Sequence, residues 1–268
     1  MPGHVSSQFV SGLLFAAPKA EQNVVIEATT PLESKPYVKM TIEVLRLHRV
    51  EVFSDEQMWS FEVPCGQVYR PTIHRVPGDF SSAAFMMAAA LVTKSRVTVK
   101  GLRRGGNQAD EVFVDIIREM GAWVREEEEA IEVGYENGLK AISFDASDAP
   151  DTVPILASLA CFAKGETEIS GIGRLSLKES DRPRAIATEL SKMGAKILIE
   201  GDTMRIRGSK LRGAPLYSYG DHRIAMACAV AALGAEGVSR VIGADAVNKS
   251  YPSFFEDLNR LGAEVIAW

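Results

Sequence analysis

The sequence lacks the features that would place the protein in a membrane or outside the cell. No Lys or Arg occurs among its first eighteen residues, so the apolar run from Phe9 to Ala17 has no positive segment ahead of it, as a secretory signal would need. No apolar run approaches the roughly 20 residues that cross a bilayer. The cysteines number only three and lie in apolar surroundings, which is typical of reduced thiols. We therefore expect a cytoplasmic protein that does not associate with membranes.

The sequence also has little that would favour nucleic acid or a metal ion. Its 30 Lys and Arg residues are outnumbered by 35 Asp and Glu residues, which argues against a general affinity for nucleic acid. The histidines show no spacing typical of metal ligands, and no pair of cysteines suggests zinc. These histidines are His4, His48, His74 and His222. We expect neither a metal nor another cofactor, and any anionic ligand must be bound by a local cluster of charge.

What the sequence does have is an internal repeat. Four Ala-rich apolar stretches begin at Ser6, Ser81, Asp151 and Asp221, which are separated by 75, 70 and 70 positions. Each stretch predicts a buried helix that starts at a Ser or Asp cap and continues through a turn into a short β-branched strand. Because helix N-termini attract anions, several such starts facing one cleft would favour phosphate or carboxylate ligands.

A second kind of helix recurs between the first. The stretches "VDIIREMGAWV", "ATELSKMGAKI" and "FEDLNRLGAEV" predict amphipathic helices that end at Gly121, Gly194 and Gly262 and then enter a strand. A fainter copy, "MTIEVLRLHRVEV", has His48 where the glycine would fall. Each unit of about seventy residues therefore holds two helices and several strands, which indicates an α/β fold of the α+β type.

Basic residues recur in the loops that precede these amphipathic helices. The repeat brings Lys35, Gln108, Lys178 and Lys249 to nearly equivalent loop positions. A positive charge at a helix start opposes the helix dipole, so its repetition suggests that the lysines serve a ligand.

Five motifs, taken together and in order, resemble the 5-enolpyruvylshikimate-3-phosphate (EPSP) synthase family, the 3-phosphoshikimate 1-carboxyvinyltransferases. They are "SSQFVSGLL", "SKPY", "LKESDR", "GDHRIAMA" and "NKSYPSFF". The resemblance implies the enolpyruvyl transferase fold, in which two domains of three βαβαββ units each keep the buried helices inside and bind substrates between the domains. We expect residues 1–77 to be the last unit of a domain that is otherwise missing and residues 78–268 to be most of the second domain, with the boundary near Pro77 and Gly78.

The resemblance also implies a transferase of the shikimate pathway of aromatic amino acid biosynthesis. Such an enzyme, usually a monomer in this family, moves the enolpyruvyl group of phosphoenolpyruvate to the 5-hydroxyl of shikimate 3-phosphate. The residues that match the family's phosphoenolpyruvate ligands are Gln8, Arg182, Arg223 and Lys249. Those that match its shikimate 3-phosphate ligands are Ser6, Ser7, Gln8, Ser34, Asp151 and Lys178. The implied catalytic residues are Asp151 as a base, Glu179 as a proton donor to carbon, and Lys178, and which of the three moves which proton is open.

Two departures from the family pattern bear on activity. Arg174 stands where the family often has an Asn that contacts the shikimate phosphate. Family members also carry further anion ligands ahead of the Ser-Ser-Gln motif, so we expect little or no turnover from this chain alone. The alternatives are a catalytically silent anion-binding domain and the related UDP-N-acetylglucosamine enolpyruvyl transferase, whose reactive-Cys loop has no evident counterpart here.

Overall fold

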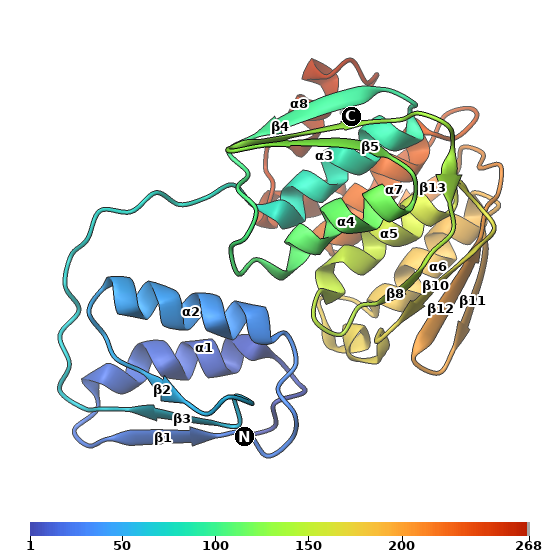
Figure 1. Ribbon diagram of the computed structural model, residues 1–268. Helices are drawn as coiled ribbons and strands as arrows, with labels where there is room; N and C mark the ends of the chain where they lie inside the picture. Colours follow the sequence, from blue (N-terminus) through green and yellow to red (C-terminus); the bar gives the residue numbers. More distant parts are fainter. Residues whose placement is uncertain (267–268) are drawn as a thin grey trace. The chain divides into compact units, whose positions relative to one another are not determined.

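The computed structural model describes residues 1–266, which form two compact units (Figure 1). The N-terminal unit comprises Met1–Pro77 together with Gly105–Ala109. The C-terminal unit comprises Gly78–Arg104 and the residues from Asp110 onward. No helix within residues 1–266 has both the length and the apolar character that spanning a bilayer requires.

The N-terminal unit is a two-helix layer on a three-stranded antiparallel sheet. The sheet has the order β1 (Val24–Glu27), β3 (Ser60–Val63), β2 (Phe53–Ser54). Helices α1 (Ser7–Ala16) and α2 (Lys35–Leu47) lie on the same face of this sheet (Figure 1). A hydrogen bond of 2.7 Å between the Ser11 and Thr41 hydroxyls joins the two helices. Their facing apolar residues and Phe61 of the sheet form the core of this unit.

The C-terminal unit pairs an inner helix with an amphipathic helix three times. Its inner helices are α3 (Phe80–Val92), α5 (Val153–Ala160) and α7 (His222–Leu233), and its amphipathic helices are α4 (Val112–Glu119), α6 (Arg182–Lys192) and α8 (Phe254–Arg260). Its larger sheets have the orders β4 (Arg96–Lys100), β6 (Ala130–Gly134), β5 (Trp123–Glu127) and β11 (Lys196–Glu200), β12 (Thr203–Arg207), β10 (Glu166–Ser170), β8 (Ser143–Asp145). Two parallel pairs complete it, β7 (Leu139–Lys140) with β9 (Ala163–Lys164) and β13 (Pro215–Tyr217) with β14 (Arg240–Ile242).

The three inner helices pack against one another in the middle of this unit. Each also packs on its own sheet, α3 on β4 and β6, α5 on β10 and β12, and α7 on β13 and β14. Their many alanines bring the backbones close, and the Ser158 hydroxyl of α5 donates a hydrogen bond of 2.9 Å to the Ala227 carbonyl of α7. The prediction of buried helices is thus confirmed for these three.

Two of the four predicted helix starts are corrected by the structure. Ser6 caps α1 and Asp221 caps α7, as the sequence predicts. Helix α3 begins earlier, because the Asp79 carboxylate accepts the backbone N–H groups of Ser81 and Ser82. Asp151 lies within a short 3₁₀ turn ahead of α5 rather than at its cap. Its carboxylate is therefore free to serve other groups.

Three of the four predicted helix ends are confirmed, and the fourth is displaced by one residue. Helices α4, α6 and α8 are followed by Gly121, Gly194 and Gly262 in the left-handed conformation, which a residue without Cβ adopts readily. After α2 the left-handed residue is Arg49, with φ of 62°, so the prediction of His48 at the glycine position is wrong by one residue. The strand expected after Gly262 is also wrong for residues 263–266, which are irregular.

Candidate functional site

The site residues of the N-terminal unit lie at the starts of its two helices. Ser6 is the N-cap of α1, and its hydroxyl accepts the backbone N–H of Gln8 at 3.2 Å. Ser7 is buried and Gln8 is exposed in the first turn. Ser34 is buried immediately before α2, in the left-handed conformation. All four therefore lie near backbone N–H groups of a helix start, which favour anions.

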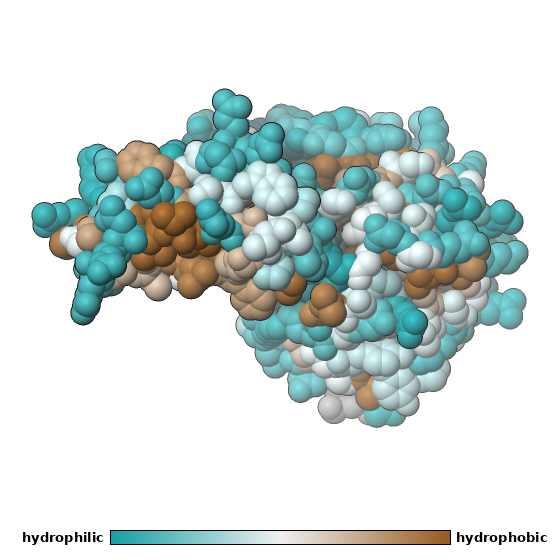
Figure 2. Space-filling view, turned by 90° about the horizontal axis from the view of Figure 1, so that it is seen from below, coloured by the Kyte–Doolittle hydropathy of each residue, from teal (hydrophilic) through white to brown (hydrophobic). Residues whose placement is uncertain are grey.

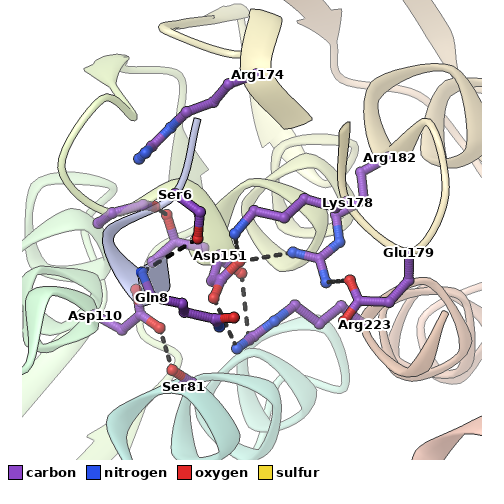
Figure 3. A network of polar contacts seen from close by, with 12 residues as sticks. Ser6, Gln8, Ser81, Asp110, Asp151, Arg174, Lys178, Glu179, Arg182 and Arg223 are labelled. Carbon is purple, nitrogen blue, oxygen red and sulfur yellow. Dashed lines mark hydrogen bonds and ion pairs between the residues drawn. The ribbon is translucent and has the colours of Figure 1, made fainter. Parts of the chain in front are cut away.

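The site residues of the C-terminal unit come from turns that precede its helices, and the structure brings them together (Figure 3). Asp151 lies in the 3₁₀ turn Pro150–Thr152, and Lys178 and Glu179 follow the 3₁₀ turn Gly173–Leu177. Arg182 and Arg223 lie in the first turns of α6 and α7. Lys249 ends the 3₁₀ turn Ala244–Lys249 ahead of α8. The α5/α6 repeat and the α7/α8 repeat thus each deliver two charged turns to a common cluster.

Arg182 is the centre of this cluster. Its side chain is only 2% exposed, and each of its nitrogens donates to a different carboxylate. Nε lies 2.8 Å from Asp221, Nη1 lies 2.6 Å from Asp151, and Nη2 lies 2.7 Å from Glu179. Three of the five N–H groups of the guanidinium are used in this arrangement, so a substrate anion that binds it competes with these carboxylates for the same charge.

Asp151 receives charge from three sides. Beyond Arg182, its Oδ2 lies 3.1 Å from Nη2 of Arg223, and its Oδ1 lies 3.8 Å from Nζ of Lys178. Burial alone would raise the pKa of this carboxyl, but Arg223, Arg182 and Lys178 outweigh it and hold the pKa well below its usual range. Asp151 is therefore an ionised hydrogen-bond acceptor at neutral pH.

Glu179 pairs with two cations. Lys249 Nζ donates a hydrogen bond to Glu179 Oε1, and Arg182 donates to Oε2. Partial burial would raise the pKa of Glu179, but the hydrogen bond from Lys249 and the charges of Arg182 and Lys249 lower it to about 2. The pKa of Glu179 therefore depends on Lys249 and Arg182, and a substrate anion would compete with Glu179 for both of these cations.

Asp110 is a group in this region that sequence reasoning missed. It is buried, its Oδ2 accepts a hydrogen bond from the Ser81 hydroxyl, and its Oδ1 has no hydrogen-bond partner within the described residues. Burial, with a smaller contribution from Asp151, raises the pKa to about 6 even though Arg223 opposes the shift. In the sequence "NQADEV" nothing marks this carboxylate as buried. The only available signal was its place two residues after Gln108 in the repeated loop.

Asp221 and its neighbours support the cluster from α7. The Asp221 side chain caps α7, accepts Arg182, and accepts the Ser180 hydroxyl at 3.0 Å. His222 follows it and is buried, and burial together with the Arg223 charge lowers the pKa of its imidazole. His222 is therefore neutral at pH 7.

Arg174 also has a defined place in the structure. Arg174 Nη2 donates to the Ser147 carbonyl at 2.6 Å, so part of its guanidinium holds the neighbouring loop. Across residues 1–266 no group of three or more His, Cys, Asp and Glu side chains is positioned to hold a metal ion.

A family model described as EPSP synthase (3-phosphoshikimate 1-carboxyvinyltransferase) matches residues 1–258. The chain belongs to the EPSP synthase family. Among curated members, the 3-phosphoshikimate 1-carboxyvinyltransferase of Methanocella arvoryzae is 45% identical over 266 residues, and that of Clostridium acetobutylicum is 40% identical over 269 residues. The alignments cover 98% and 100% of this chain, respectively, and 62% of each relative. The chain thus spans less than two thirds of the length of these EPSP synthases.

Solved structures agree with the family. An EPSP synthase of Acinetobacter baumannii superposes with a TM-score of 0.79 at 28% identity, over 95% of this chain and 60% of that one. A second structure of EPSP synthase from the same organism gives a TM-score of 0.78 at 27% identity. The fold of this chain is therefore that of EPSP synthase, a mixed α/β fold with several small sheets.

Proposed function

We propose that this chain contributes to the transfer of the enolpyruvyl group of phosphoenolpyruvate to the 5-hydroxyl of shikimate 3-phosphate, with release of phosphate. The observation that carries the proposal is the cluster around Arg182, in which Asp151, Lys178, Glu179, Arg223 and Lys249 meet. Both substrates are polyanions, and the cluster combines cations that bind anions with carboxylates that accept or donate protons.

In this proposal Arg223, Lys249 and Arg182 bind phosphoenolpyruvate. The guanidinium groups bind carboxylate or phosphate through two parallel hydrogen bonds, and Lys249 adds a compact charge. On the shikimate 3-phosphate side we assign Asp151 and Lys178 together with the helix starts of the N-terminal unit. The residues assigned there are Ser6, Ser7, Gln8 and Ser34, with Gln8 also assigned to phosphoenolpyruvate.

The proton steps follow from the chemistry of addition and elimination. The 5-hydroxyl oxygen adds to C2 of phosphoenolpyruvate, the hydroxyl proton leaves, and C3 gains a proton. C3 then loses a proton as the C2–O bond to phosphate breaks. We assign Asp151 as the acceptor for the hydroxyl proton. It is ionised, but Arg223, Arg182 and Lys178 hold its pKa low, so its proton affinity reaches what a base needs only when substrate anions take over these cations. Lys178, beside it, is the third group assigned to these transfers.

Glu179 suits proton donation to C3 once substrate is bound. Its pKa of about 2 is set by Lys249 and Arg182. A substrate anion that takes over these two cations would let the pKa rise toward its ordinary value, which is what a proton donor needs.

We further propose that residues 1–77 form one βαβαββ unit of a first domain, that residues 78–268 form most of a second, and that these 268 residues alone turn over slowly. The relatives from Clostridium acetobutylicum and Methanocella arvoryzae are longer than this chain, which supports the expectation of slow turnover. The three unpaired cysteines support a cytoplasmic location.

The test combines substrate binding with steady-state phosphate release by the purified chain. We expect phosphoenolpyruvate to bind in the millimolar range, Arg223→Gln to weaken that binding at least tenfold, and phosphate release to be slow. Arg207→Gln, an exposed arginine of β12, is the control for loss of one positive charge. If Arg223→Gln binds phosphoenolpyruvate as tightly as the parent chain does, the site assignment is contradicted. Consumption of UDP-N-acetylglucosamine instead of shikimate 3-phosphate would favour the related transferase.

A further inference from the structure

A charged cavity lies in the N-terminal unit, at the end of α2. It encloses about 700 Å³ and is open to solvent. Arg46 and Arg49 line it from the helix end, and Arg70 lines it from the segment that follows β3. None of its lining residues is among those assigned to the enolpyruvyl transfer site, so the cavity needs an explanation of its own.

The two walls of this cavity are tied together by paired hydrogen bonds. Gln67 accepts the Glu51 backbone N–H at 2.7 Å and donates to the Glu51 carbonyl at 3.0 Å. The Arg70 backbone N–H donates to the His48 carbonyl at 2.9 Å, and the His48 ring Nδ1 lies 2.9 Å from the Arg70 carbonyl. The cavity is therefore held in shape before any ligand binds, which lowers the entropic cost of binding.

The charge of the cavity is unbalanced. Three arginines line it against one acidic residue, Glu51. Within residues 1–266 no carboxylate forms an ion pair with Arg46, Arg49 or Arg70, whereas most arginines of the C-terminal unit's sheets and helices do have such a partner. The helix dipole accounts for a basic residue in the last turn of α2, such as Arg46, but not for Arg70.

Arg49 adds an independent observation. It occupies the left-handed position that follows the amphipathic helix, where the three sister positions have Gly121, Gly194 and Gly262. A side chain is disfavoured in this conformation relative to glycine. A residue that lines a cavity in a backbone conformation it disfavours points to a role for its side chain.

We propose that this cavity binds an organic phosphate of the nucleoside diphosphate class. Each arginine can bind phosphate oxygens through two hydrogen bonds. Three arginines therefore offer more hydrogen-bond donors than a single phosphate group needs, which favours a diphosphate. Phe53 and Val68, which also line the cavity, are 56% and 54% exposed and offer apolar surface to a ring. The volume lies within the range of small-molecule sites, roughly 300–1,000 Å³.

The main experiment measures the binding of ADP to the 268-residue chain by titration calorimetry. Arg49→Gly is the decisive variant, because it removes one guanidinium and installs the residue that its left-handed backbone prefers. We expect this variant to weaken ADP binding at least tenfold while its melting temperature stays the same or rises. Lys39→Gln, an exposed position on the same helix, removes the same charge outside the cavity and should change the affinity less than twofold.

Three further measurements test which parts of ADP are recognised and where on the protein ADP binds. Pyrophosphate should bind at least tenfold more weakly than ADP, and adenosine should not bind detectably, because the proposal needs both the phosphates and the ring. Arg223→Gln should leave ADP binding unchanged, since it belongs to the other cluster. The proposal is overturned if ADP does not bind at millimolar concentration, if pyrophosphate binds as tightly as ADP, or if Arg223→Gln rather than Arg49→Gly weakens binding. These outcomes concern the N-terminal unit and are separate from those of the enolpyruvyl transfer proposal.

Discussion

Helix α1 of the N-terminal unit and helices α3, α5 and α7 of the C-terminal unit share one sequence pattern but differ in burial. Phe9, Leu13 and Phe15 of α1 are 56%, 47% and 45% exposed, whereas Phe85 and Leu91 of α3 are at most 1% exposed. Apolar surface is visible on the smaller unit, at the left of Figure 2. An apolar sequence pattern therefore indicates that a helix can be buried. The helices and strands that pack against it decide whether its side chains are buried in the fold.

The charged helix starts show the same contrast. In the C-terminal unit three inner helices pack together, and Arg182 and Asp221 at the starts of α6 and α7 are buried with them. In the N-terminal unit α1 has one helix, α2, as its main helical neighbour, and Gln8 in its first turn is exposed. Packing of like helices thus creates the buried surroundings in which the charged cluster forms.

The largest effect should come from removing the buried arginine. Arg182→Ala leaves Asp221, Asp151 and Glu179 without their shared cation, and one of these carboxylates is fully buried. We expect it to lower the free energy of unfolding of the C-terminal unit by about 3–5 kcal/mol. Urea unfolding followed by hydrogen exchange, which reports α6 and α2 separately, measures it.

The control for that change is Arg207→Ala, whose side chain is 69% exposed and pairs with Glu166. We expect it to cost less than about 1 kcal/mol. Equal costs for the two arginines would show that burial of Arg182 contributes nothing.

A matched pair of leucines tests the helix comparison directly. Leu91→Ala on α3 creates a cavity among the inner helices and should cost about 2–4 kcal/mol. Leu13→Ala on α1 removes a side chain that is 47% exposed and should cost less than about 1 kcal/mol. Both are read from urea midpoints in the same buffer, and a larger loss for Leu13→Ala would break the comparison.

Asp110 and Glu179, two carboxylates of the C-terminal unit, should affect stability in opposite directions as the pH changes. The Asp110 pKa of about 6 lies above its ordinary value, so the native state prefers the protonated form and loses stability as pH rises from about 4 to above 6. Asp110→Asn should therefore be more stable than the parent at pH 8, by about 2–3 kcal/mol, and similar to it at pH 4.

Glu179→Gln should show the opposite sign. The Glu179 pKa of about 2 lies below its ordinary value, so its contribution is present above about pH 4.5 and is lost as pH falls through about 2. The variant should be less stable than the parent at pH 7 and should match it near pH 2. Thermal unfolding from pH 2 to pH 8 tests both carboxylates, and parallel curves for the two variants would contradict the assignment.

The smallest effect concerns the left-handed residues after the amphipathic helices. Arg49→Gly relieves a disfavoured backbone conformation and should stabilise the N-terminal unit by about 0.5–1 kcal/mol. Gly121→Ala, at the sister position with φ of 95°, should destabilise the C-terminal unit by about 1–2 kcal/mol. Differential scanning calorimetry distinguishes the two signs.

Much of the local structure was predictable because its causes are local. The repeat placed eight helices, and the glycines marked the ends of α4, α6 and α8. The prediction erred by one residue at Arg49, because that position has no glycine to mark it. It erred at Ser81 and Asp151 because Asp79 supplies a better placed cap and a 3₁₀ turn precedes α5. The roles of the site residues remain predictions.

The sequence by itself determined the helices, two of the four inner-helix starts, most of the strands that follow the helices and membership of the EPSP synthase family. These depend on residues within a few positions of one another, or on motifs that can be read in order. Only the tertiary structure decided that Arg182 is shared by three carboxylates, that Asp110 is buried with a raised pKa, and that α1 keeps an exposed apolar face. Apart from the Arg182–Glu179 pair, desolvation and ion pairing here depend on groups that lie 29 to 72 residues apart in the chain, and only folding sets their distances.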